Sequence, residues 1–395
     1  MSSKFSVAAS LREKQSVGPN PVFQFLRRLA GRFDYMQIVP MLTLLAIGAL
    51  FIYGTGQQVG GVHAEVFWKR QLFYMGLGFT AWLILSFTDY RWFGPASFVL
   101  YPLSLLLLGY VLLNGVERFG ARRWLDIAGV SIQPSEIAKL GILLGASWLL
   151  SMKKADINKL PWAAGLCLLT ALPFLLILKE PDLGTALVLI PVVGTIAFTG
   201  GLKWRYLLIL LIAGAAFMPT AYYMMKPYQK ERIRVFLDPD RDPQNRGWNQ
   251  LQAEMAVGSG GLTGKGFMQG THCTLGYLPQ TVANSDFIFP VIAEETGLLG
   301  TLALVFIYAA LLFSILRTAI LAPDAFGRYL CVGVAVLLLT HTAVNIGMCI
   351  RIAPVTGLPL PLVSYGGTFM IATMVYLGIV QSVYIHRDKE TFMAL

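Results

Sequence analysis

Long apolar runs dominate this chain and constrain its fold more than any other feature. Each of ten runs approaches the roughly 20 residues that a helix needs to cross the hydrocarbon core of a bilayer. Charged residues make up only 13% of the 395 positions, against roughly 25% in soluble domains. We therefore expect an all-α integral membrane protein with ten transmembrane helices. The expected spans are 36–54, 71–87, 93–113, 136–151, 161–178, 185–201, 205–225, 286–316, 325–350 and 363–386.

The positions of lysine and arginine predict which way these helices face. If the N-terminus is cytoplasmic, the short inner segments hold 16 of these residues and the short outer segments hold 7, which agrees with the positive-inside rule. We expect both termini to be cytoplasmic, with a basic leader at 1–35, a membrane domain at 36–386 and a tail at 387–395. The net charge of +10 suits an anionic lipid surface better than a nucleic acid, because the basic residues form short clusters between apolar runs.

One connection is much longer than the others. Residues 226–285 are expected to form a large extracytoplasmic loop between the seventh and eighth helices. Residues 228–237 and 248–257 have helix-like patterns inside it, separated by the turn-rich stretch 238–243. Long loops with structure of their own are usually functional, so we expect part of the site to lie here.

Three acidic positions and one lysine are the first candidates for chemistry. Glu136 and Lys139 lie at membrane depth, three residues apart on one helix face, so they are either a self-contained ion pair or part of a substrate site. Asp182 lies in a tight turn, where it either caps the next helix or offers a carboxylate. Asp286 lies where the long outer loop enters a helix. A carboxylate placed there can accept a proton, and the alternative is a plain N-cap.

Deeper in the same helix, Glu294 and Glu295 need a cation or a shared proton, and structural pairing is the expected role for them. The four histidines are scattered along the sequence, so we expect proton chemistry to rest on carboxylates.

A glycine-rich segment at 258–266 includes Lys265. Its spacing misses the P-loop pattern, so it is either a backbone nest for a lipid-borne phosphate or a flexible turn. Residues 359–367, with two prolines and two glycines, predict a bent and closely packed start to the last helix. Together with the outer basic residues, these features suggest a lipid-linked anionic substrate at the outer leaflet. The outer basic residues are Arg122, Arg123, Arg232, Arg234 and Lys265.

Several motifs resemble those of the SEDS family (shape, elongation, division and sporulation) and occur in the family's order, from about residue 36 to 386. The motif at 361–367 favours the elongation branch, RodA, over the division branch, FtsW. The motifs are Trp-Leu-Asp at 124–126, Gln-Pro-Ser-Glu at 133–136, Glu-Pro-Asp-Leu-Gly-Thr at 180–185, Gly-Ser-Gly-Gly-Leu-Thr-Gly-Lys-Gly at 258–266, Asp-Phe-Ile-Phe at 286–289 and Pro-Leu-Val-Ser-Tyr-Gly-Gly at 361–367.

The resemblance implies a peptidoglycan glycosyltransferase that polymerises lipid II into β-1,4 glycan strands at the outer face of the cytoplasmic (inner) membrane during cell elongation. It also implies a class B penicillin-binding protein as the crosslinking partner. The family's essential aspartate falls on Asp286, which we expect to be the general base, with inversion at the anomeric carbon of MurNAc and release of undecaprenyl pyrophosphate. The same matching carries over Glu136, Lys139 and Asp182 as substrate-binding residues.

The leaving pyrophosphate needs positive charge. Arg232 and Lys265 are our candidates for binding it, and Asp182 is a candidate ligand of a divalent cation, Mg²⁺ or Mn²⁺. One stretch departs from the family pattern, because residues 278–285 lack the histidine that many relatives have before the aspartate. Two alternatives remain: a lipid II flippase, which needs a polar track to the inner side, and a noncatalytic scaffold for the crosslinking enzyme.

Overall fold

The computed structural model describes residues 31–58, 64–118, 121–127, 130–225, 227–238, 246–278 and 283–387. Nearly all of the basic leader and of the tail lies outside these residues, and so does most of the turn expected at 238–243.

Helices account for most of the described chain, and each of the ten expected spans overlaps one of them, while the count of ten transmembrane helices stays a prediction. Among the described residues, six helices are long and apolar enough to cross a membrane, namely α3, α5, α7, α14, α15 and α16. The protein is therefore an integral membrane protein. The ten helices are α3 (Tyr35–Gln58), α4 (Ala64–Phe87), α5 (Phe93–Asn114), α6 (Pro134–Ser151), α7 (Leu160–Lys179), α8 (Leu183–Thr199), α9 (Trp204–Met224), α14 (Ile288–Leu321), α15 (Ala325–Cys349) and α16 (Gly367–Ile385).

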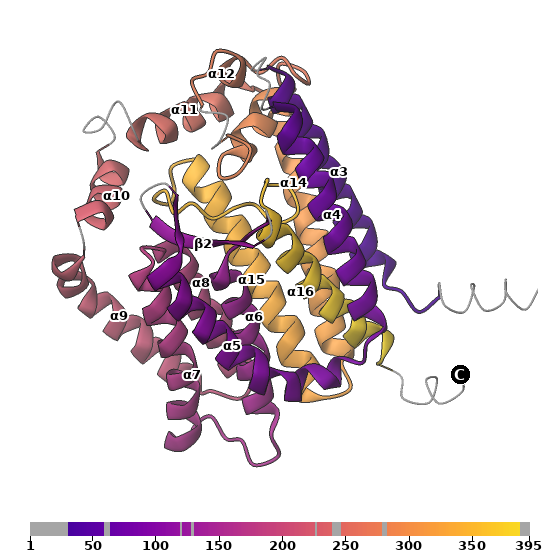
Figure 1. Ribbon diagram of the computed structural model, residues 1–395, viewed down its shortest axis with the longest axis vertical. Helices are drawn as coiled ribbons and strands as arrows, with labels where there is room; N and C mark the ends of the chain where they lie inside the picture. Colours follow the sequence, from indigo (N-terminus) through magenta and orange to yellow (C-terminus); the bar gives the residue numbers. More distant parts are fainter. Residues whose placement is uncertain are drawn as a thin grey trace, which may run out of the picture.

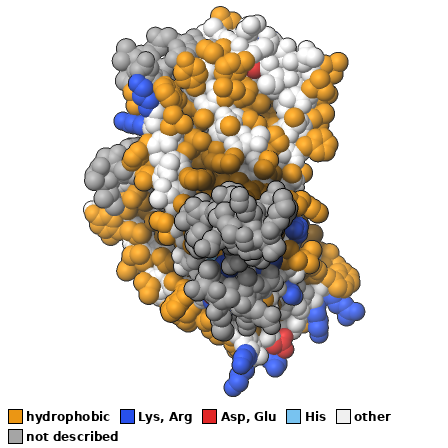
Figure 2. All heavy atoms as spheres, turned by 90° about the vertical axis from the view of Figure 1, so that its right-hand side faces the viewer, with side chains coloured by type: hydrophobic (Ala, Val, Ile, Leu, Met, Phe, Trp, Pro, Cys, Tyr) orange, Lys and Arg blue, Asp and Glu red, His pale blue; other side chains and the backbone are white. Residues whose placement is uncertain are grey.

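The molecular surface matches that of a protein in a bilayer. Hydrophobic side chains are spread over the described part of the face in Figure 2, whereas lysine and arginine side chains gather mainly at its lower end and in a small group near the upper left. Large apolar residues such as Phe306 and Ile320 of α14 are 72% and 80% exposed. Such exposure is stable when lipid rather than water covers the surface.

Helices α15 and α16 form the centre of the bundle. Helix α16 packs against α4, α6 and α15, and α14 packs against α3 and α15. Helix α9, by contrast, runs along the outer edge of the molecule (Figure 1) and is exposed over nearly its whole described length.

A small sheet corrects the expectation of an all-helical chain. Strands β1 (Val116–Arg118), β2 (Ala121–Ile127) and β3 (Val130–Ile132) pair antiparallel in that order between α5 and α6. The sequence analysis missed these strands because β1 and β3 have only three residues each, and the seven residues of β2 do not alternate strictly between apolar and polar.

The long loop contains the two expected helices. They are α10 (Pro227–Leu237) and α11 (Arg246–Ser259), and a single turn, α12 (Thr271–Thr274), follows. Figure 1 shows α10, α11 and α12 in the upper half of the molecule, away from the connection between α6 and α7.

Helix α14 has a kink at Gly297, where φ is 66°, and the glycine-rich segment is bonded to both sides of it. The backbone amides of Lys265 and Gly266 donate to the carbonyls of Glu294 and Glu295, each at 3.0 Å. In return, the amides of Leu298 and Leu299 donate to carbonyls of the segment at 2.9 and 3.1 Å. The segment is therefore a docked loop that supplies the hydrogen bonds the kink removes from the helix. It is neither a flexible turn nor an open phosphate nest, because these amides already have partners.

This docking predicts a steric difference between two neighbouring glycines. A Cβ at Gly260 would lie 2.1 Å from the carbonyl oxygen of Ala293, whereas a Cβ at Gly258 would meet nothing within 4 Å. We expect Gly260→Ala to lower the apparent melting temperature of the detergent-solubilised protein by several degrees, through overpacking of about 1–3 kcal/mol. Gly258→Ala should be neutral or slightly stabilising. Equal melting temperatures for both variants would contradict the docked loop.

Candidate active site

Asp286 lies in a turn whose backbone is held by residues distant in sequence. Three consecutive carbonyl oxygens, those of residues 284–286, accept hydrogen bonds from Tyr365 N at 2.8 Å, Ser364 Oγ at 2.5 Å and Asn345 Nδ2 at 2.9 Å. Because the turn belongs to no regular element, these bonds fix its position.

The Asp286 side chain is half-buried. Gly357, at φ 75°, lies against its carboxylate, since a Cβ there would be 3.3 Å from Oδ2. Asp286 is not the N-cap residue of α14, because Phe287 occupies that position and makes no side-chain capping bond. The position therefore suits a carboxylate that is partly desolvated and held still.

Asp182 is the N-cap of α8, as one of the two sequence interpretations predicts. Its carboxylate accepts from Thr185 N at 3.2 Å and from Thr185 Oγ1 at 2.9 Å, and from Gln133 Nε2 at 3.3 Å. Arg123 of β2 lies 3.8 Å away and donates through Nε to the carbonyl of Glu180 at 2.8 Å. The sheet that the sequence analysis missed is thus what brings Arg123 to the turn between α7 and α8.

Glu180 is a buried carboxyl group beside this cluster. It is 1% exposed, and neither of its side-chain oxygens has a hydrogen-bond partner. Burial and the negative charge of Asp182 raise the pKa of Glu180 to about 8, against the opposing effect of the positive charge on Arg123. Glu180 is therefore protonated at neutral pH in the folded protein.

Four helices begin around these residues. Helix α6 reaches α8 through Gln133 and Asp182, and it reaches α16 through the bond from Gln133 N to Thr368 Oγ1. The segment before α16 holds the turn that leads into α14. The N-termini of these four helices are therefore linked to one another, and their partial positive charge favours a bound anion nearby.

Glu136 and Lys139 form the expected ion pair, with Lys139 Nζ 2.8 Å from Glu136 Oε1. Both side chains are buried, and Lys139 also contacts His341 Nε2 at 3.1 Å. The predicted ion pair between Glu136 and Lys139 is confirmed. Contact with substrate stays a prediction, which would require this buried pair to become accessible.

Glu294 is also paired, as expected. Its Oε1 accepts from Lys265 Nζ at 2.6 Å, and it contacts His272 Nδ1 at 2.9 Å and Thr271 N at 2.9 Å. Lys265 would have to leave Glu294 to bind a pyrophosphate, so its role in substrate binding stays a prediction. Arg232 lies in α10, and its side chain is outside the described part of the structure.

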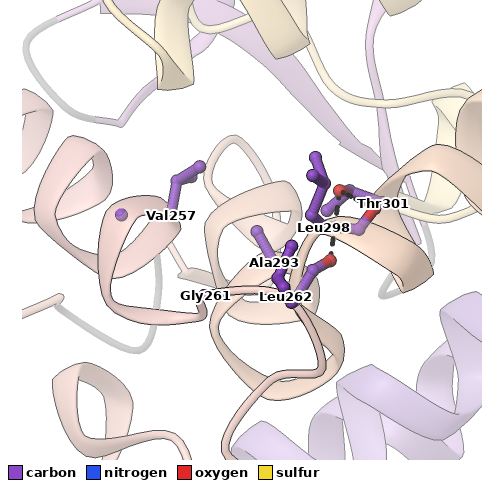
Figure 3. A pocket seen from close by; sticks show the side chains of 8 residues that line it. Val257, Gly261, Leu262, Ala293, Leu298 and Thr301 are labelled. Carbon is purple, nitrogen blue, oxygen red and sulfur yellow. Dashed lines mark hydrogen bonds between the residues drawn. The ribbon is translucent and has the colours of Figure 1, made fainter.

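An apolar pocket of about 360 Å³ lies between the glycine-rich loop and the kink of α14. Figure 3 shows Val257, Leu262, Leu298 and Thr301 around it. Its lining has no ionisable side chain, and Asp286 is not part of it. It is therefore not the place where the Asp286 carboxylate would meet a sugar.

Comparison with known proteins identifies the family. The model of the FtsW, RodA and SpoVE family, described as "Cell cycle protein", matches residues 35–389. The chain belongs to this family. It is 36% identical over 357 residues to peptidoglycan glycosyltransferase MrdB of Escherichia coli K12, covering 90% of this chain and 94% of that protein. It is 33% identical over 369 residues to the probable peptidoglycan glycosyltransferase FtsW of Trichlorobacter lovleyi, with the same two coverages.

Solved structures show the same fold. A chain of a complex described as "Structural coordination of polymerization and crosslinking by a peptidoglycan synthase complex" matches with a TM-score of 0.78 and 34% identity, covering 90% of this chain and 99% of that one. The rod shape determining protein RodA of Thermus thermophilus matches with a TM-score of 0.67 and 30% identity, covering 90% and 97%. The RodA-like fold expected from the motifs is thus confirmed.

Sequence reasoning missed three residues that the structure places in or beside the site. His341 and Asn345 looked like ordinary residues of an apolar helix, and their partners lie in distant segments. Glu180 belongs to a recognised motif, but its lack of a hydrogen-bond partner is visible only in three dimensions.

The raised pKa of Glu180 predicts a pH-dependent stability. The unfolded chain loses this proton near pH 4.5 and the folded protein near pH 8, so the free energy of unfolding falls across that interval as pH rises. Glu180→Gln should therefore be more stable than wild type, by up to about 5 kcal/mol above pH 8, with a smaller gap at pH 6. Melting temperatures in detergent at the two pH values test this.

Glu117→Gln is the matched control, since it removes the same charge from an exposed position on β1. A stability gap between Glu180→Gln and wild type that stays constant with pH would contradict the buried, protonated carboxyl.

Proposed function

We propose that this protein is a peptidoglycan glycosyltransferase of the elongation type, which polymerises lipid II into β-1,4 glycan strands. The observation that carries the proposal is a fixed, half-buried carboxylate, Asp286, at the end of the bundle where four helix N-termini meet. Identity of 36% to MrdB supports the activity and favours elongation over division, since the FtsW match is at 33%.

The proposed reaction requires a base at the acceptor sugar. The 4-hydroxyl of the acceptor GlcNAc loses its proton to the Asp286 carboxylate while its oxygen attacks the anomeric carbon of the donor MurNAc. The bond to undecaprenyl pyrophosphate breaks on the opposite face, so the α-linked donor gives a β-linked product. The bonds to residues 284–286 hold the carboxylate in place for this step.

The departing pyrophosphate carries negative charge and needs stabilisation. The converging helix N-termini and Arg123, whose guanidinium is held on the turn between α7 and α8, supply it. Arg232 and Lys265 remain candidates for the same role. Glu136 and Lys139 remain proposed substrate-binding residues, and this role requires their buried ion pair to become accessible.

A divalent cation fits this site only together with substrate. Among the described residues, no group of three or more His, Cys, Asp or Glu side chains could hold a metal ion. Asp182 would supply one carboxylate, since Mg²⁺ is often bound by one or two carboxylates together with substrate phosphates, whereas Glu180 is no ligand while it is protonated. A cation held there would neutralise charge on the pyrophosphate.

The proposed setting is the cytoplasmic (inner) membrane, with all ten helices spanning it, both termini inside and the site facing outward. The lysine and arginine bias between the short connections supports this orientation. The proposed partner is a class B penicillin-binding protein, because one matching structure is of a complex described as coordinating polymerization and crosslinking.

Asp286→Asn tests the proposed base. It keeps the shape of the side chain but removes the proton acceptor, so we expect the rate of lipid II polymerisation by the purified protein, with its partner, to fall at least about 100-fold. Asp156→Asn, which changes a partly exposed acid in the connection between α6 and α7, should keep the wild-type rate.

The assay uses lipid II in detergent and measures glycan chain length, so no bilayer has to be crossed. Undiminished polymerisation by Asp286→Asn would contradict the base. Complete absence of product from wild type with its partner would favour the flippase alternative.

Removal of metal tests the proposed cation. A chelator should stop polymerisation and added Mg²⁺ should restore it, and Asp182→Asn should need roughly 10-fold more Mg²⁺ for half-maximal rate. Asp156→Asn again serves as the control. Polymerisation that is unaffected by the chelator would contradict the proposed cation. It would show that the helix N-termini and Arg123 are enough to stabilise the departing pyrophosphate.

A further inference from the structure

Helix α15 carries three polar residues on one face, at His341, Asn345 and Cys349, four positions apart. Asn345 Nδ2 donates to the carbonyl of Asp286 at 2.9 Å and to that of Leu358 at 2.7 Å. Cys349 Sγ lies 3.8 Å from the same Asp286 carbonyl. This face therefore holds the turn of Asp286 and the segment that packs against it.

His341 contacts two elements at once. Its Nε2 lies 3.1 Å from Lys139 Nζ, and its Nδ1 lies 3.4 Å from the carbonyl oxygen of Pro359. The side chain is fully buried. It thus joins the ion pair on α6 to the segment that places Gly357 beside the Asp286 carboxylate.

The partners of His341 determine its tautomer. Lys139 is an ammonium bound to Glu136 at 2.8 Å and can only donate, so Nε2 must carry the lone pair. The proton then sits on Nδ1 and is donated to the Pro359 carbonyl. In the other tautomer, a lone pair on Nδ1 would face that carbonyl oxygen and repel it.

We propose that His341 is a positioning residue for the glycosyl transfer: Lys139 selects its Nδ1-protonated tautomer, and the Nδ1 proton holds the segment around Pro359 so that the Asp286 carboxylate stays in place. The inference rests on the role of Asp286 in the proposed function. A buried link of this kind affects the chemical step more than substrate affinity, because it sets the position of a reacting group.

Two substitutions separate the link from simple space filling. His341→Leu fills a similar volume with no polar atom, whereas His341→Asn places an amide donor close to where Nδ1 is, and so keeps the bond to Pro359. Thr342→Val is the matched control, because the Thr342 hydroxyl is buried on the same helix and has no hydrogen-bond partner.

Polymerisation kinetics with lipid II measure the effect. We expect His341→Leu to lower kcat by about 10- to 100-fold with KM within about 2-fold of wild type, and His341→Asn to recover kcat to within about 3-fold. Thr342→Val should match wild type. The proposal is overturned if His341→Leu keeps the wild-type kcat, if the Leu and Asn variants are equally impaired, or if only KM changes.

A second measurement does not depend on activity. In full-length protein labelled with ¹⁵N-histidine, the resonances lost in His341→Asn identify His341, and near neutral pH they should report a protonated Nδ1 and an unprotonated Nε2. A protonated Nε2 would overturn the proposal even if the enzyme is active. Failure of the proposed function would give a different result from failure of this inference. It would appear as full activity in Asp286→Asn while the tautomer of His341 is unchanged.

Discussion

The position of Asp286 depends on one requirement, which is that buried backbone carbonyls find hydrogen-bond donors where no helix supplies them. Residues 284–286 are irregular, and their three carbonyls are satisfied by Tyr365, Ser364 and Asn345. Irregular backbone at the level of a membrane is stable only when it is enclosed by protein in this way. The turn before α14 and the segment before α16 therefore stabilise each other, and the carboxylate between them is fixed before any substrate arrives.

Buried charged side chains also need partners, and those near this turn have them. Glu136 is paired with Lys139 inside the bundle, and Glu294 of α14 is paired with Lys265 and His272 of the long loop. Removing one partner of a buried pair costs about 3–5 kcal/mol, because the other charge is left uncompensated. A loss of activity on substituting Lys139 or Lys265 would therefore reflect the fold as much as any contact with substrate, and melting temperatures must accompany such kinetics.

Features that depend on neighbouring residues could be predicted from the sequence. Helices over the apolar runs follow from run length, although the number that cross the membrane stays a prediction beyond the six that are long and apolar enough among the described residues. The pairing of Glu136 with Lys139 follows from their spacing on one helix. The N-cap at Asp182 follows from its turn.

Features that depend on contacts between distant segments could not be predicted from the sequence. His341 meets Pro359 and Lys139 only after three elements pack together, and the glycine-rich loop finds its partner in the kink of α14. Residues 359–366 were expected to open a bent helix, but they stay irregular and α16 begins at Gly367, because their amides and side chains bond to the Asp286 turn.

The central claim is that the Asp286 carboxylate takes the proton from the acceptor sugar at the outer mouth of the bundle. The most direct measurement is an experimental structure of the Asp286→Asn protein, with its partner, trapped with lipid II in both the donor and acceptor positions. The account predicts that the side chain of residue 286 lies within about 3 Å of the acceptor 4-oxygen, with the donor pyrophosphate near the N-termini of α6 and α8. A lipid II complex in which both sugars bind away from residue 286 would contradict it.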